Sequence, residues 1–170
     1  MDAVELTERQ APLKDRYRSE PATATVTLRA AGELGSETVA CSVATGSALV
    51  EAGLHPMTGG DGTLACSGDM LLQALVACAG VTLRAIATAR GLDVTGTVHA
   101  EGDLDFRGTL GLDREAPVGF SKIRLRFDLR SDASQEDLSA LIATTERYCV
   151  VLQTLKNSPS TVTDVKASSG

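Results

Sequence analysis

The sequence predicts an α+β fold, in which strands and helices follow one another without the regular alternation of a doubly wound sheet. Two observations support this class. Stretches that alternate apolar and polar residues lie on both sides of a long apolar segment, and a second segment with helical periodicity lies near the C-terminus. A length of 170 residues fits one compact unit. We therefore expect a single domain over residues 21–170, preceded by a mixed, charged arm over residues 1–20.

The first elements after the arm are expected to be strands. Residues 22–29 and 37–43 alternate small or polar side chains with apolar ones, and the stretch from Gly32 to Gly35 supplies turn residues between them, so we expect a hairpin. Residues 55–63 concentrate Gly and Pro and are expected to form a loop. It is not a phosphate-binding loop, because no Lys-Ser or Lys-Thr pair follows its glycines.

A long helix is expected to start near Ser67-Gly68-Asp69, with apolar residues that run from Met70 to Ala89. Ser67 is suited to be its N-cap, Asp69 to be an acid in its first turn, and Gly91 to be the left-handed residue after its end. The segment is apolar nearly all the way round. We therefore expect a central helix that is buried on most sides.

Two further strands are expected over residues 93–100 and 120–129, joined by a long connection. In the later strand Ile123, Leu125 and Phe127 face one way while charged residues between them face the other, which is typical of a half-buried strand.

The C-terminal part of the domain should hold one helix and one strand. Ser134 is suited to cap a second helix that continues toward Asn157. Residues 161–165 are then expected to close the chain as an edge strand.

Charge and composition exclude several kinds of partner. The 16 Lys and Arg residues against 22 Asp and Glu give a net charge of -6, which repels phosphate backbones, and an aromatic content of 3% offers few surfaces for stacking bases. No run approaches the roughly 20 apolar residues needed to cross a bilayer, and the N-terminus lacks the layout of a signal peptide. We therefore expect a cytoplasmic protein that binds neither nucleic acid nor a membrane.

The cysteines are the first place to look for chemistry. Cys41, Cys66, Cys78 and Cys149 form no CxxC pair, and the chain has only two histidines, so we expect no metal and no other cofactor. Cys78 lies in the middle of the central helix and Cys149 in the second helix. By spacing alone each can be a small core residue.

A different interpretation of these two cysteines stays open. Two helices that carry one thiol each could bring together sulfurs 71 positions apart, and such a dithiol reduces an oxidant through a sulfenic acid and then a disulfide. Cys66 is a weaker partner for Cys78, because twelve residues of mostly helix separate the two by about 18 Å. Cys41 is most simply a core residue of a strand.

Several local motifs resemble the OsmC/Ohr family. The first set surrounds Cys78, and its segments are Gly59-Gly60-Asp61-Gly62, Cys66-Ser67-Gly68-Asp69-Met70-Leu71-Leu72 and Ala77-Cys78-Ala79-Gly80-Val81-Thr82-Leu83-Arg84. The second set leads to Cys149, and its segments are Glu101-Gly102-Asp103-Leu104-Asp105, Arg107-Gly108, Pro117-Val118-Gly119-Phe120 and Thr145-Glu146-Arg147-Tyr148-Cys149-Val150-Val151. Two cysteine helices in this order and at this separation are a fairly specific signal.

The resemblance implies both a fold and an activity. It implies an intertwined homodimer in which antiparallel sheets from both chains surround two central helices, with active sites at the subunit interface. It also implies thiol-dependent reduction of organic hydroperoxides, with Cys78 as the peroxidatic cysteine and Cys149 as the resolving one. The disulfide would be reduced by an external dithiol or by a lipoylated protein.

The sequence departs from the family pattern close to both cysteines. The family's well-characterised peroxidases have a Glu ten residues before the first cysteine, where this chain has Gly68 beside the shorter Asp69. In those peroxidases a Pro usually follows the second cysteine, where this chain has Val150.

The cation that would activate Cys78 is the third departure. An Arg from the N-terminal region is expected, and Arg16, Arg18 and Arg29 are all candidates. These departures motivate an alternative, which is a catalytically weak or inactive OsmC-like protein that binds a small apolar or thiol-containing ligand at the dimer interface. A third hypothesis is a redox-sensing disulfide that regulates a partner protein.

Overall fold

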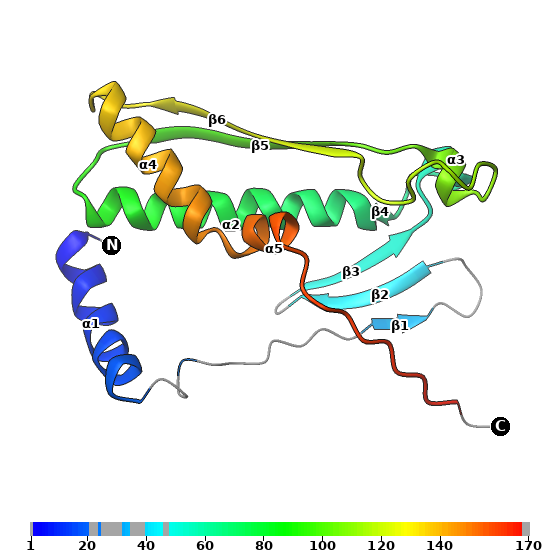
Figure 1. Ribbon diagram of the computed structural model, residues 1–170, viewed down its shortest axis with the longest axis horizontal. Helices are drawn as coiled ribbons and strands as arrows, with labels where there is room; N and C mark the ends of the chain where they lie inside the picture. The colour runs from blue at the N-terminus through cyan, green and yellow to red at the C-terminus, as the bar shows by residue number, and fades with distance from the viewer. Residues whose placement is uncertain (1, 21–23, 25–31, 35–39, 46–47, 168–170) are drawn as a thin grey trace.

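The computed structural model describes residues 2–20, 24, 32–34, 40–45 and 48–167 and confirms the α+β class (Figure 1). Its elements in chain order are α1 (Ala3–Ser19), β1 (Gly32–Leu34), β2 (Ala40–Thr45), β3 (Ala48–Gly53), the 3-10 turn η2 (Pro56–Thr58), β4 (Ala65–Cys66), α2 (Ser67–Ala89), β5 (Thr95–Asp103), α3 (Phe106–Thr109), β6 (Lys122–Arg130), α4 (Gln135–Tyr148) and α5 (Val150–Lys156). One sheet has four strands in the order β1-β2-β3-β4, and the other consists of β5 and β6.

The helix α2 is the central element of the described fold. In Figure 1 the long ribbon of β5 and β6 runs along one side of α2, and α4 and α5 lie against it as well. The two strands are antiparallel over their whole length, with Val98 opposite Phe127 and Ala100 opposite Leu125. These side chains pack against the buried residues of α2, and charged residues occupy the other face, so the half-buried strand predicted here is confirmed.

The single chain buries only one stripe of α2. Leu75, Ala79, Leu83 and Ala87 recur every four residues and are the buried residues of this helix. Val81, on another face, is 71% exposed. The expectation of burial on most sides is therefore wrong for one chain, because the described elements that contact α2 bury only this stripe.

The length and composition of α2 also correct the expectation about apolar runs. Its 23 residues include a window with mean hydropathy 1.8, which is long and apolar enough to cross a bilayer. The core helix of a soluble protein passes the same test. In this fold α2 is the helix on which β5, α4 and α5 pack.

The ends of α2 are partly as predicted. Gly91 follows the helix with a φ of 66°, in the left-handed region that favours glycine, as expected. The N-cap is Cys66 and not Ser67, and no side chain caps the first turn.

The predicted second helix is divided in two. Ser134 caps α4 as expected, with its hydroxyl oxygen accepting the backbone N–H of Asp137 at 3.1 Å. The helix then ends at Tyr148, and α5 starts again at Val150. The edge strand expected over residues 161–165 is absent, since these residues are irregular and exposed.

The N-terminal part differs from expectation in detail. Within the expected arm, residues 3–19 form α1, and the carboxylate of Asp2 accepts the N–H of Glu5 at its start. A hairpin is present, but Gly32–Leu34 is strand β1, paired with β2, and not the turn between two strands. The strand predicted over residues 22–29 lies outside the described residues apart from Ala24, as does the side chain of Cys41.

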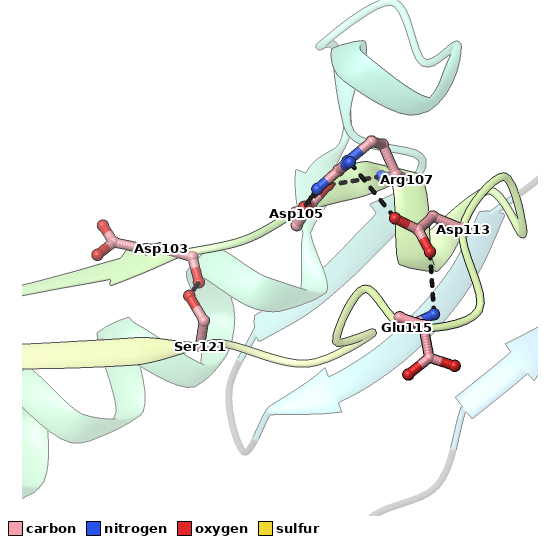
Figure 2. A network of polar contacts seen from close by, with 6 residues as sticks. All are labelled: Asp103, Asp105, Arg107, Asp113, Glu115 and Ser121. Carbon is pink, nitrogen blue, oxygen red and sulfur yellow. Dashed lines mark hydrogen bonds and ion pairs between the residues drawn. The ribbon is translucent and has the colours of Figure 1, made fainter.

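A polar network holds the connection between β5 and β6 (Figure 2). The carboxylate of Asp105 caps α3 and pairs with the guanidinium of Arg107 at 2.5 Å, and Arg107 also reaches Asp113 at 3.4 Å. The hydroxyl of Ser121 donates to the carbonyl of Asp103 at 3.1 Å and closes the connection at its base. These bonds fix the wall that α3 forms near the start of α2.

Candidate active site

The structure brings Cys78 and Cys149 together, although 71 positions separate them in the chain. Cys78 lies in the middle of α2 and is partly buried, and Cys149 lies at the break between α4 and α5 and is fully buried. Both are free cysteines that belong to one apolar cluster with Leu75, Ala79 and Leu152. The two thiols are close enough for each to shift the pKa of the other.

The break at Cys149 exposes backbone donors. Cys149 has φ -71° and ψ 107°, an extended conformation, so it ends one helix and starts the next. Its own N–H donates to the carbonyl of Thr145 and its carbonyl accepts the N–H of Gln153, both at 2.9 Å. The N–H groups of Val150 and Val151 come at the start of α5, where no helical acceptor precedes them. Both groups lower the pKa of the Cys78 thiol.

These donors determine the ionisation of Cys78. Burial alone would raise the pKa of its thiol. Hydrogen bonds from the Val151 N–H, the Cys149 thiol, the Val150 N–H and the Thr82 hydroxyl outweigh burial, so that the pKa of Cys78 lies below its ordinary value. No Lys or Arg among the described residues takes part in this stabilisation.

The second thiol shifts in the opposite direction. Burial is the main cause that raises the pKa of Cys149, and the negative charge of the Cys78 thiolate raises it further, although the Leu152 N–H acts against both. Cys78 is therefore the thiol of the pair that ionises more readily. Chemically, Cys78 is equipped to be a nucleophile and Cys149 to donate a hydrogen bond to it.

The remaining candidate residues lie elsewhere. Asp69 is exposed in the first turn of α2, nine residues before Cys78, which corresponds to about 13 Å along the helix. Arg16 and Arg18 are exposed on α1, where Arg18 pairs with Asp15 at 2.6 Å, and Arg29 lies outside the described residues. Cys66 is the N-cap of α2, twelve residues before Cys78, and is not among the groups that act on the thiol pair.

Sequence reasoning missed the groups that contact the Cys78 sulfur. Thr82 lies one helical turn after Cys78, so helical spacing could have identified it. Val150 and Val151 act through their backbone N–H groups, and their side chains carry no signal for this role. Among the described residues no group of three or more His, Cys, Asp or Glu side chains is placed to hold a metal ion.

The break also leaves the carbonyl of Glu146 without a backbone N–H donor, and a side chain takes the place of that donor. The Gln153 side chain donates to the carbonyl of Glu146 at 2.8 Å, in place of the N–H that a continuous helix would supply. The Glu146 carboxylate pairs with Lys156 at 3.2 Å, which links α4 to α5 a second time. These two contacts hold the break in its bent conformation.

Comparison with known proteins gives a consistent result. The family model described as OsmC-like protein matches residues 60–164, more than half of the chain and a range that includes both cysteines. No curated protein matches the chain significantly.

Solved structures show the same fold. An OsmC-like protein from Mycoplasma pneumoniae superposes with a TM-score of 0.64 at 16% identity, covering 78% of this chain and 89% of its own. The organic hydroperoxide resistance protein OsmC from Legionella pneumophila gives 0.56 at 18% identity, covering 78% and 90%. The organic hydroperoxide resistance protein OhrB from Bacillus subtilis gives 0.51 at 16% identity, covering 78% and 93%. At these identities the likeness shows the fold alone.

Proposed function

The chain belongs to the OsmC-like protein family, and from that premise we propose that it is a thiol-dependent peroxidase that reduces organic hydroperoxides. Cys78 is the peroxidatic cysteine and Cys149 the resolving one. The observation that carries the proposal is that the fold brings Cys78 and Cys149 into one apolar cluster, where the pKa of Cys78 is lowered and that of Cys149 is raised. Two relatives of the same fold are described as organic hydroperoxide resistance proteins.

In the first step the Cys78 thiolate attacks the peroxide. A bond forms between its sulfur and the terminal oxygen of the hydroperoxide while the O–O bond breaks. The organic group leaves with its oxygen and takes up a proton as an alcohol, and Cys78 becomes a sulfenic acid. The donors around the sulfur favour this step because they lower the pKa of the nucleophile.

In the second step Cys149 resolves the sulfenic acid. The negative charge that raises the pKa of Cys149 disappears once Cys78 is oxidised, so Cys149 can lose its proton more easily. Its sulfur attacks that of Cys78, a disulfide forms and the hydroxyl leaves as water. An external dithiol or lipoylated protein then reduces the disulfide, with no resident cofactor.

The working form of this enzyme is a cytoplasmic homodimer. Val81, on the turn after Cys78, and Val150, next to Cys149, are 71% and 70% exposed in the single chain. A second copy packed on this apolar surface would remove it from water and would shield the thiol pair. We expect neither nucleic acid nor a membrane as a partner, in keeping with the net charge of -6.

The test is a single-turnover oxidation. The reduced protein is mixed with one equivalent of cumene hydroperoxide, and its thiols are mapped by peptide mass spectrometry without reduction. The expected product is a Cys78–Cys149 disulfide that dihydrolipoamide reverses, with no product in Cys78→Ser. Cys66→Ser is the matched control and should react like the parent.

The alternative function predicts a different outcome of the same test. It is supported by the lack of any described cation at Cys78. An OsmC-like protein that only binds a small apolar or thiol-containing ligand would keep both thiols reduced in a folded protein. That result would reject the peroxidase proposal.

A further inference from the structure

An apolar cavity of about 430 Å³ lies at the N-terminal end of α2, away from the thiol pair. Its walls come from the loop after β3, the first turn of α2 and the connection between β5 and β6, and its apolar side chains are Leu54, Leu71, Leu104, Phe106, Val118 and Phe120. Neither Cys78 nor Cys149 lines it. Leu71 is seven residues before Cys78, which corresponds to about 10 Å along the helix.

Gly68 keeps this cavity open. A Cβ at this position would come into ordinary van der Waals contact with Phe120 at 3.4 Å, with the Cys66 sulfur at 3.6 Å and with Leu104 at 3.7 Å. A longer side chain on Gly68 would therefore project into the space that these three residues surround.

Contacts within the protein hold part of the opposite wall. The ring of Phe120 lies against Gly102, at which any Cβ would overlap it. The helix α3, which contributes Phe106 to the cavity, is held by the ion pairs of Arg107 with Asp105 and Asp113 (Figure 2). A cavity with preformed walls binds a ligand without the cost of ordering them.

His55 is a polar residue in the wall of the cavity. Its ring stacks on Phe106 with centroids 4.9 Å apart, and its Nδ1 accepts the N–H of Met57 at 3.1 Å. The proton of the neutral ring is therefore on Nε2, which has no acceptor among the described residues. None of the described residues that line the cavity is a Lys, Arg, Asp or Glu.

From this combination we propose that the cavity is a second, independent binding site for a small, uncharged, largely apolar molecule that carries one hydrogen-bond acceptor. Apolar walls account for most of the contact area, the acceptor takes the Nε2–H of His55, and the lack of described charges disfavours an ion. The volume suits a ligand of two fused rings or a comparable branched ketone or ester. This site does not depend on peroxidase activity.

The probe for the test is prodan, a neutral naphthalene with a ketone whose emission shifts to the blue in apolar surroundings. We expect it to bind the full chain at one site and to slow alkylation of Cys66, which lines the cavity. Gly68→Leu should weaken binding at least tenfold, and Thr109→Phe, which enters from α3, should do the same if the first variant fails to fold. Asp69→Leu is the matched control, because it adds the same side chain one position later and outside the cavity.

The role of His55 is tested by comparing the binding of two probes, one with a ketone and one without. His55→Phe should weaken prodan about threefold to tenfold, the value of one hydrogen bond, and should leave N-phenyl-1-naphthylamine, which has no ketone, unchanged. Binding should persist in Cys78→Ser, so the outcome is independent of the proposed catalysis. Equal binding by Gly68→Leu and the parent, or equal loss in Asp69→Leu, would place the probe on another apolar surface and overturn the proposal.

Discussion

Replacing Val150 with Pro removes one hydrogen-bond donor from Cys78 and leaves the surrounding fold in place. Val150 is the first residue of α5, a position that favours Pro because its N–H makes no helical bond. Cys149 before it has φ -71° and ψ 107°, close to the extended conformation that Pro requires of its predecessor. The Val150 side chain is 70% exposed in the single chain, so the Pro ring meets no buried neighbour of the same chain.

The expected effect is a rise in the pKa of Cys78. A hydrogen bond to a charged group contributes about 1.5–3 kcal/mol, and 1.36 kcal/mol corresponds to about one pKa unit. Because Cys78 is partly exposed and keeps three other donors, we expect the low end of this range, about one unit. The thiolate fraction below the pKa then falls about tenfold, while a more basic thiolate is a better nucleophile, so the oxidation rate at neutral pH falls about threefold.

The assay is the rate of Cys78 alkylation by iodoacetamide as a function of pH, followed by peptide mass spectrometry. The rate of the parent should fall as the pH drops through the lowered pKa of Cys78. The midpoint of Val150→Pro should lie higher. Val150→Ala is the control, because it shortens the side chain and keeps the N–H. Equal midpoints in two folded variants would refute the role of this backbone donor.

Three further predictions concern the other contacts of the pair. Thr82→Val removes a hydroxyl donor at nearly constant shape, so the same alkylation midpoint of Cys78 should rise by less than in the Pro variant. Cys149→Ser keeps a hydroxyl near Cys78 but cannot form the disulfide. One equivalent of hydroperoxide should therefore leave Cys78 as a sulfenic acid that dimedone labels. Labelling of Cys78 in the parent but not in this variant would contradict the prediction. Gln153→Met leaves the carbonyl of Glu146 without its donor and should lower the free energy of unfolding in urea by about 1 kcal/mol, with an unchanged midpoint as the contrary result.

The elements that the sequence predicts well are those with a local cause. The bounds of α2 follow from a continuous apolar segment that ends before Gly91, and β6 follows from strict alternation over Lys122–Arg130. The cap at Ser134 is a contact between residues three positions apart. Each of these signals lies within a few residues of the feature that it predicts.

The break at Cys149 has no such signal. Val150, Val151 and Leu152 continue an apolar helical pattern, so periodicity predicts a single helix. The bend depends on contacts made in the folded chain, such as the pairing of Glu146 with Lys156. The apolar sequence of α2 led to a wrong prediction of burial on most sides for a related reason. An apolar pattern indicates which residues avoid water, but it does not show whether the same chain covers them.

The bend itself explains how the pKa of the partly buried Cys78 thiol is lowered although no Lys or Arg of the described residues contributes. In a continuous helix the N–H groups of Val150 and Val151 would bond to carbonyls one turn earlier and would be unavailable to Cys78. The break releases these two donors in a partly buried place, where unpaired N–H groups are costly, and the Cys78 thiolate is the acceptor that they meet. Ionisation of Cys78 and the start of α5 therefore stabilise each other. Forming the disulfide replaces the thiolate with a neutral sulfur, which weakens both bonds, so oxidation should loosen the start of α5.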